Sequence, residues 1–400
     1  MTTPIIEYPP KGGPLISVDS CIKALSKISE LYIIARIPQN QIGAIETEVF
    51  YSKFCNDYLY VPSNNNLSSN RYLRKFQKIA RDFLSIDSNF IINYFDEKDI
   101  DILWCDRGIS TSASLIKKIK KKRPDIPIVC DTEAVQSKFI LREIPFQKSY
   151  FKKIKIYLKG KKAQRNEKQI FNLSNVITAV SEIDASYYRK TFNYQAKVKI
   201  YSNVVDTNNY SKESAPNNLF HPSILLAGTF YGNNSPMEEG TRWFISNVLP
   251  LVKKEIPEIH LYIIGRNSSK ILNDIKDKSI TVLGEVDSVV PYLSNVDVVI
   301  VPIRFESGTR FKILEAGAAG RPVVSTTLGA EGLSVTNGKD IFIADDQISF
   351  SLSIIKVLNN TKISYNLGNN LKQLIIENYS LDKLEKEGQN IVKYIMDNKK

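Results

Sequence analysis

Short runs of β-branched and other apolar residues alternate with amphipathic segments along almost the whole chain of 400 residues. This alternation is typical of βα units, in which helices cover both faces of a parallel sheet. A chain of this length exceeds one ordinary core, so we predict two doubly wound, Rossmann-like α/β domains. The expected strands are 4–9, 30–36, 57–62, 101–105, 126–131, 175–181 and 198–203 in the first domain, and 223–230, 259–265, 280–284, 296–303, 322–326 and 340–344 in the second.

The domain boundaries follow from where this pattern stops. A polar stretch, DTNNYSKESAPNNLF, predicts a linker at 206–220. The first domain then spans 1–205 and the second 221–378, while 379–400 is expected to form a C-terminal helix that packs back on the first domain. Ligands of such sheets bind at the carboxyl ends of the strands, where loops enter helices. A cleft between the two domains is therefore the expected site.

The chain carries an excess of positive charge, +12 with a pI near 9.2, which indicates an anionic partner. Much of this charge lies in 152–168, KKIKIYLKGKKAQRNEK, and a second basic run lies at 117–123. A basic amphipathic segment suits an anionic membrane surface. The alternative is an ordinary solvated helix in a lysine-rich protein.

No segment of the sequence predicts a membrane span or a signal peptide. The N-terminal residues MTTPIIEYPPKGG lack a basic region followed by a long apolar one. No window reaches the ~18 apolar residues that a span requires. Three of the four scattered cysteines lie in or beside apolar runs, as buried thiols do. We expect a cytoplasmic location, with peripheral contact on the inner face of a membrane left open.

The segment GTRFKILEAGAAGRPVVSTTLGAEGL, residues 308–333, carries the most chemical information. It follows a predicted strand, and Ser307 or Thr309 is placed to cap a helix that begins near Arg310. The free N–H groups and partial positive charge at a helix start bind phosphate. Arg310 and Lys312 would add two cations there.

Glu315 lies three residues after Lys312, so the two side chains share a helix face. The carboxylate could then accept hydrogen bonds from ribose hydroxyls while Lys312 holds phosphate. The alternative is a surface helix with an ordinary ion pair between these two residues.

These residues resemble the donor-binding segment of family 4 glycosyltransferases of the GT-B fold, G-T-R-x-K-x-x-E-A-x-x-x-G-x-P-V-V-x-T followed by G-x-E-G-L. The resemblance implies a transferase that moves a sugar from a nucleotide-diphosphate donor to a glycan or lipid-linked acceptor in polysaccharide or lipopolysaccharide biosynthesis. It also implies retention of configuration and no required metal or cofactor. Further similar segments, in the same order, are PPKGGP (9–14), NVITAVSE (175–182), SNVVDTNNY (202–210), IHLYIIGR (259–266) and GEVDSVVPYLSNVDVVIVP (284–302).

The resemblance also implies roles for single residues. The glycine loop and the helix start after Gly308 would face the diphosphate, Glu315 would contact the ribose, and the segment from Gly284 would lie near the base. Arg310 and Lys312 would stabilise the leaving diphosphate as charge develops on it. The other donor-binding candidates are Gly12, Gly13, Gly228, Arg266, Val286, Arg304, Glu306, Ser307 and Thr309.

The second domain departs from the family pattern in two places. Ser307 stands where the family often has Glu, and Glu306, one place early, could reach the sugar instead. The usual Arg and Lys after the first strand of this domain are missing from AGTFYGNNSPMEEG, 227–240. Arg304, Arg310 and Lys312 would then carry more of the phosphate charge.

The first domain has no histidine at the strand end where many family members have one near the acceptor. The segment VCDTEAV, 129–135, offers Asp131 and Glu133 in its place. These carboxylates could position or deprotonate the acceptor hydroxyl, or they could be structural.

Other functions stay open on the residues alone. A UDP-sugar 2-epimerase uses the same two domains, but its cleft commonly includes His, and His221 and His260 both lie in the second half. Two distant histidines also do not predict a zinc site. A nucleic-acid-binding protein fits the pI, although the basic runs lack aromatic platforms, so no nucleic-acid partner is expected. A catalytically inactive binding module is the remaining alternative.

Overall fold

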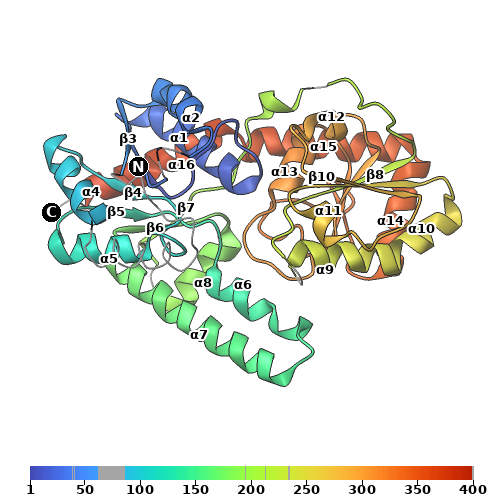
Figure 1. The fold of residues 1–400 in the computed structure, drawn as a ribbon, viewed down its shortest axis with the longest axis horizontal. Coiled ribbons are helices and arrows are strands. Elements are labelled where there is room, and N and C mark those ends of the chain that lie inside the picture. The colour runs from blue at the N-terminus through green and yellow to red at the C-terminus, as the bar shows by residue number, and fades with distance from the viewer. Residues whose placement is uncertain are drawn as a thin grey trace. The chain divides into compact units, whose positions relative to one another are not determined.

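The computed structural model describes residues 1–37, 39, 41–61, 86–193, 195–211, 213–232 and 235–398. The chain divides into two compact units, shown in Figure 1. Unit 1 comprises Met1–Ser202 and Leu384–Lys400, and unit 2 comprises Asn203–Lys383. The cleft predicted between the two domains stays a prediction.

The described part of unit 1 contains a parallel sheet of seven strands in the order β3-β2-β1-β4-β5-β6-β7. The order reverses between β1 and β4, where Thr2 pairs with Ile34 on one side and with Cys105 on the other. The strands are β1 (Thr2–Thr3), β2 (Tyr32–Ala35), β3 (Asp57–Tyr60), β4 (Leu103–Cys105), β5 (Ile128–Cys130), β6 (Val176–Ala179) and β7 (Val198–Ile200).

The first strand is shorter and earlier than predicted. The expected strand at 4–9 is wrong, because Pro4 has no N–H to donate to a neighbouring strand. The ladder is instead made by the residues before it, since Ile34 N donates to Met1 O and Arg36 N donates to Thr3 O.

Helices cover both faces of this sheet. Helices α1 and α16 lie together on one face, while α5, α7 and α8 lie on the other (Figure 1). Leu115, Ile116 and Ile119 of α5 join the buried core, whereas Lys121 and Lys122 are exposed. The helices are α1 (Gly13–Ile28), α2 (Ala44–Tyr51), α4 (Ile86–Glu97), α5 (Ala113–Lys122), α6 (Gln136–Arg142), α7 (Tyr150–Leu173), α8 (Glu182–Phe192) and α16 (Leu381–Asp397), with short 3₁₀ turns at Ser52–Phe54 and Ile144–Phe146.

The C-terminal helix α16 belongs to unit 1, as predicted. Its side chains Leu384, Ile391 and Ile395 are buried in unit 1. Gly388 allows close approach to α1, since a Cβ there would lie 2.9 Å from Ile28 Cδ1. The Glu387 carboxylate accepts hydrogen bonds from the backbone N–H and the hydroxyl of Ser202, at 2.7 and 3.1 Å.

The described part of unit 2 contains a second parallel sheet, with six strands in the order β10-β9-β8-β11-β12-β13. Both sheets are doubly wound, and the predicted α/β fold class is confirmed. The strands are β8 (Ser223–Ala227), β9 (His260–Ile264), β10 (Ile280–Gly284), β11 (Val298–Val301), β12 (Val323–Ser325) and β13 (Phe342–Ile343), and the helices are α9 (Pro236–Trp243), α10 (Leu249–Glu255), α11 (Ser268–Ile271), α12 (Val290–Leu293), α13 (Phe311–Ala318), α14 (Gln347–Asn359) and α15 (Thr361–Asn378).

The helical segment expected at 241–257 is interrupted. A π-helical turn at Phe244–Val248 separates α9 from α10, and Leu249 N donates to Phe244 O across it. Pro250 follows directly and cannot donate to the preceding turn, so the helix widens before it.

The stretch 206–220, expected to be a linker, forms part of unit 2. Thr207–Tyr210 is a 3₁₀ helix that the Asp206 side chain caps. Tyr210 is buried, and its hydroxyl donates to Glu315 Oε1 at 3.2 Å. The polar residues of this stretch form local turns and one long-range hydrogen bond. Composition alone therefore did not distinguish the stretch from a flexible linker.

Candidate functional site

The sheet of unit 2 ends in three glycines on neighbouring strands. Gly228 follows β8, Gly265 follows β9, and Gly284 ends β10. Gly228 N donates to Ile264 O at 2.8 Å and Gly265 N donates to Gly284 O at 2.7 Å. A Cβ on Gly265 would lie 1.7 Å from Gly228 O, so only glycine fits there. The carboxyl ends of β8 and β9 therefore approach each other closely, with no room for a side chain at Gly265.

Lys312 lies over this edge. A Cβ on Gly228 would lie 2.6 Å from Lys312 Cε, which places the lysine stem beside the end of β8. Among the residues that the structure describes, the Lys312 ammonium has no hydrogen-bond or ion-pair partner. The half-buried cation at the start of α13 is thus available to an anion.

The N-terminus of α13 has no side-chain cap among the described residues, in contrast to the sequence prediction. The N-cap residue is Arg310, and no side chain makes a capping hydrogen bond. The Ser307 hydroxyl is buried and has no hydrogen-bond partner, while Thr309 Oγ1 accepts from Asn203 Nδ2 at 2.8 Å. The prediction that Ser307 or Thr309 caps the helix is therefore wrong. Gly308, with φ of +86°, turns the loop before α13, and Ile313 N in the first turn donates to Arg310 O at 3.1 Å.

Arg310 is directed back onto its own loop. Its guanidinium is buried, and Nη1 donates to the carbonyl oxygens of Ser307, at 2.9 Å, and of Gly308. Its Nε lies 3.0 Å from Glu306 Oε2. These contacts fix the loop between β11 and α13, so Arg310 and Glu306 shape this loop together.

Glu315 lies one turn further along α13. The Tyr210 hydroxyl donates to its Oε1, and burial raises its pKa, while the charge of Lys312 and the hydrogen bond from Tyr210 act in the opposite direction. No ion pair within 4.0 Å joins Lys312 to Glu315 in the described chain. The ordinary surface ion pair considered as an alternative is therefore not formed.

The remaining candidates of unit 2 lie around the same edge. The Arg304 guanidinium packs over the Trp243 ring, 5.0 Å from its centroid. Arg266 follows β9 and lies 3.3 Å from Glu285, with both side chains about half exposed. Val286 is half-buried in the loop after β10.

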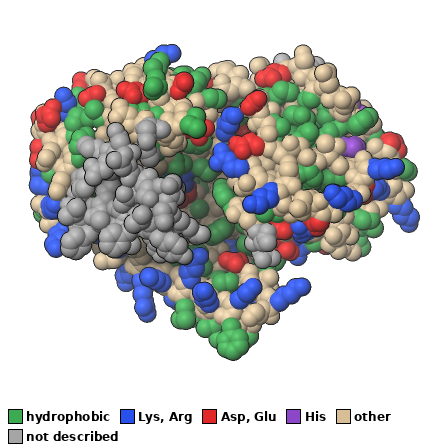
Figure 2. Space-filling view, viewed as in Figure 1, with side chains coloured by type: hydrophobic (Ala, Val, Ile, Leu, Met, Phe, Trp, Pro, Cys, Tyr) green, Lys and Arg blue, Asp and Glu red, His purple; other side chains and the backbone are tan. Residues whose placement is uncertain are grey.

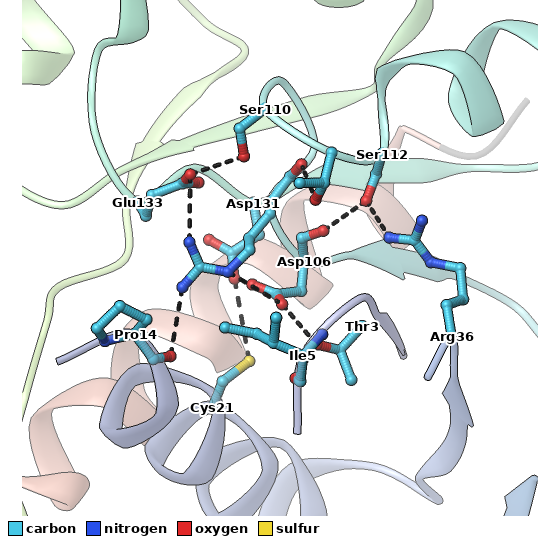
Figure 3. A network of polar contacts seen from close by, with 12 residues as sticks. Thr3, Ile5, Pro14, Cys21, Arg36, Asp106, Ser110, Ser112, Asp131 and Glu133 are labelled. Carbon is cyan, nitrogen blue, oxygen red and sulfur yellow. Dashed lines mark hydrogen bonds and ion pairs between the residues drawn. The ribbon is translucent and has the colours of Figure 1, made fainter. Parts of the chain in front are cut away.

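Unit 1 carries a second polar cluster at the carboxyl ends of its strands, shown in Figure 3. Asp131 follows β5 and accepts hydrogen bonds from Thr178 Oγ1, at 2.6 Å, and from Trp104 Nε1, at 3.0 Å. Burial raises its pKa, and these two hydrogen bonds oppose the rise. Both carboxylate oxygens of Asp131 therefore have partners within the protein.

Glu133 connects this cluster to the predicted glycine loop. It accepts from Ser110 Oγ at 2.7 Å and lies 3.3 Å from Arg107 Nη1. Arg107 Nη2 donates in turn to the carbonyl oxygen of Pro14, in the first turn of α1. Gly12 is the N-cap residue of α1, with φ of +83° and no side-chain cap, and Gly13 begins the helix. The structure thus brings Glu133 and the glycine loop together through Arg107.

Sequence reasoning missed Asp106 and Arg107, which follow β4 directly. Asp106 is buried, accepts from Thr3 Oγ1 at 2.6 Å, and lies 3.9 Å from Arg107 Nε. Burial raises the pKa of Asp106 to about 7, with Arg107 opposing the rise. The available signal was the charged pair placed just after a buried strand, where the strand order of the sheet reverses.

The structure also bears on metals and membranes. Within the described residues, no group of three or more His, Cys, Asp or Glu side chains could hold a metal ion, and metal independence stays a prediction. None of the described helices combines the length and apolar character that crossing a membrane requires.

The two doubly wound units define an α/β protein of the GT-B class, and the comparisons with known proteins agree. Residues 222–360 match the family model described as Glycosyl transferases group 1. The match covers β8 to α14 and includes the whole candidate edge of unit 2. It confirms the resemblance inferred from the segment 308–333.

The particular relatives are distant in sequence. A Klebsiella pneumoniae protein, described as an uncharacterized 44.6 kDa protein in the cps region, is 28% identical over 176 residues, which are 42% of this chain and 45% of that protein's length. Sucrose-phosphate synthase from Thermosynechococcus elongatus superposes with a TM-score of 0.72 at 13% identity. The superposition covers 98% of this chain and 95% of the synthase chain. A TarM variant from S. aureus, in complex with fondaparinux, α-GlcNAc-glycerol and UDP, gives a TM-score of 0.67 at 14% identity and 98% coverage of both chains. At these identities, the solved structures support the fold.

Proposed function

We propose that the protein is a glycosyltransferase that moves a sugar from a nucleotide-diphosphate donor to a glycan or lipid-linked acceptor. The family match over residues 222–360 supports this assignment, because it spans the edge where the donor would bind. Neither the epimerase nor the nucleic-acid-binding alternative is favoured by that match.

One observation carries the proposal: the side chain of Lys312, which forms no hydrogen bond or ion pair with a described residue, lies beside Gly228 near the first turn of α13, which has no side-chain cap. A diphosphate placed there would receive backbone N–H groups and a lysine charge together. When the bond between the anomeric carbon and the diphosphate oxygen breaks, negative charge grows on the diphosphate. Fixed donors that interact more strongly with this charge lower the barrier.

The neighbouring carboxylate of Glu315 would orient the donor. Tyr210 occupies Oε1, and Oε2 has no hydrogen-bond partner in the described chain, so it could accept from a ribose hydroxyl. Arg310 and Glu306 would act by holding the loop, since their contacts lie within it. We expect retention of configuration from the family resemblance.

UDP is the first nucleotide to test, because TarM was crystallised with it. TarM was also crystallised with saccharides, which makes a glycan the acceptor class to test first. In unit 1, Asp106 would be the acceptor-side acid or base, because a carboxyl with a pKa of about 7 can exchange protons near neutral pH. Asp131 and Glu133 would help to position the acceptor.

A membrane surface is the proposed place of action. Helix α7 exposes Phe151 (82%) and Leu158 (62%) among its lysines. In Figure 2, blue cationic and green apolar side chains gather at the lower end of the view, where Figure 1 shows α7. Cations attract an anionic leaflet, at about 1 kcal/mol each near the surface, and apolar side chains enter it.

The donor assignment is tested by thermal shift with UDP, GDP and UDP-sugars. We expect a nucleotide diphosphate to raise the melting temperature of the wild-type protein. Lys312→Ala should lose most of this stabilisation, since a charge-assisted contact contributes about 1.5–3 kcal/mol. Lys254→Ala, an exposed lysine of α10, is the matched control and should respond like the wild type. An equal response of the two variants, or no response to any nucleotide, would refute the assignment.

A further inference from the structure

A cavity of about 670 Å³ lies at the opposite edge of the unit 2 sheet. Pro222, Asp297 and Pro322 line it, and they directly precede β8, β11 and β12. It is therefore at the amino ends of these strands, whereas the candidate donor edge is at their carboxyl ends. The C-terminal end of α14, with Val357 and Leu358, and helix α15 form other walls, and Ala319 and Gly320 line it just after α13; Figure 1 labels these helices.

Two cations, Arg321 and Lys372, line this cavity. Arg321 Nη1 donates to Val296 O at 3.2 Å, but the half-buried guanidinium has no carboxylate within 4.0 Å in the described chain. Burial lowers its pKa, and the charge of Asp297 opposes this change. Lys372 of α15 likewise makes no ion pair with the described residues. A partly buried cation is costly unless an anion compensates it.

The acidic group of the cavity is already engaged. Asp297 Oδ2 lies 2.7 Å from His221 Nδ1 and accepts from the N–H and the hydroxyl of Ser223, at 2.7 and 2.8 Å. The charge of Asp297 also acts on Arg321 and offsets part of the positive charge of the wall. The positive charge of the cavity wall exceeds its negative charge.

The remaining wall is suited to a polyhydroxyl compound. Thr361 and Ser364 contribute hydroxyls and Asn369 an amide, all from α15. Tyr365, 70% exposed, offers an aromatic face beside them. Pockets that bind small molecules combine such faces with a few fixed polar groups.

We propose that this cavity is a second binding site, for a monosaccharide that carries a phosphate or carboxylate group. Arg321 and Lys372 would bind the anionic group, and the side chains of α15 would contact the ring hydroxyls. The site goes beyond the proposed transferase function, because donor binding at Lys312 does not use it.

The test is a ligand-observed NMR titration with glucose 1-phosphate, glucuronate and uncharged glucose. It is performed on the full chain carrying Lys312→Ala, so that a sugar phosphate at the donor edge does not contribute. We expect both anionic sugars to bind and glucose to bind at least about tenfold more weakly. A charge-assisted hydrogen bond contributes at least this factor to the affinity. Equal binding of all three sugars would overturn the proposal.

Lys372→Gln and Arg321→Gln should each weaken the anionic sugars by about tenfold or more. Lys362→Gln removes the same charge from the same helix outside the cavity and should leave binding unchanged. If Arg321→Gln does not fold, the exposed Lys372 still decides the question. Two results would overturn the proposal by showing that the sugars bind elsewhere. The first is undiminished binding of the anionic sugars by Lys372→Gln, and the second is binding only by the chain in which Lys312 is intact. A UDP titration of the wild type distinguishes the two failures. If UDP binds, only the second site is refuted, and if UDP does not bind, the proposed function fails as well.

Discussion

Asp106 allows a quantitative test of the unit 1 cluster through the pH dependence of stability. It is 8% exposed, and burial raises its pKa from 3.8 to about 7. Below pH 3.8 the carboxyl is protonated in both the folded and the unfolded chain, so it has no effect there. Between pH 3.8 and about 7, the unfolded chain releases the proton while the folded chain retains it. The free energy of unfolding therefore falls as the pH rises through this window and stays low above it.

The size of this effect follows from the two pKa values. A difference of about three pH units corresponds to about 4 kcal/mol. Asp106→Asn removes the titration and keeps an acceptor for the Thr3 hydroxyl. The variant should match the wild type near pH 4 and exceed its free energy of unfolding by up to about 4 kcal/mol at pH 8.

Urea unfolding followed by tryptophan fluorescence measures this difference. The chain has two tryptophans, and Trp104 lies in unit 1. In a Trp243→Phe background, the emission reports on unit 1 alone. Glu30→Gln removes an exposed carboxylate of the same unit and is the control. If the difference in the free energy of unfolding between Asp106→Asn and its parent is the same at pH 5 and pH 8, Asp106 does not retain its proton in the folded chain and the inference is wrong.

Three further predictions address the donor edge and α7. Gly228→Ala places a Cβ 2.4 Å from Met237 Cε and 2.6 Å from Lys312 Cε, and it should lower UDP affinity about tenfold by calorimetry, while folding is preserved because these flexible side-chain ends can move. Glu315→Gln should weaken UDP more than 2′,3′-dideoxy-UDP, and equal losses would argue against a ribose contact. The double change Phe151→Ser and Leu158→Ser should reduce flotation with anionic liposomes without altering UDP affinity; unchanged flotation at low salt would remove the membrane role of α7.

The sequence was sufficient to predict most of both sheets. Strands such as β9 and β11 are continuous apolar runs with both faces buried, so the local pattern alone identifies them. The first strand failed because Pro4 interrupts an otherwise strand-like run. Gly228 and Gly284 were predictable for a similar local reason, since they lie at the ends of strands, whereas Gly265 was not predicted.

The parts that could not be predicted depend on contacts between distant residues. Thr309 is held by Asn203, 106 positions earlier, instead of capping α13. Tyr210 donates to Glu315, 105 positions away, which draws the expected linker into unit 2. The charged pair Asp106 and Arg107 after a strand was a local signal, but the raised pKa of Asp106 results from burial, which depends on strands that the sequence separates widely.

The position of α16 determines how the chain can be divided for experiments. Unit 2 is one continuous stretch, so nucleotide binding could be studied on a fragment of residues 203–383 without cutting through either sheet. Unit 1 is discontinuous, and a fragment that stops at Ser202 would expose the surface that Leu384, Ile391 and Ile395 normally cover. A ribosome must therefore synthesise the entire second unit before the first can be completed.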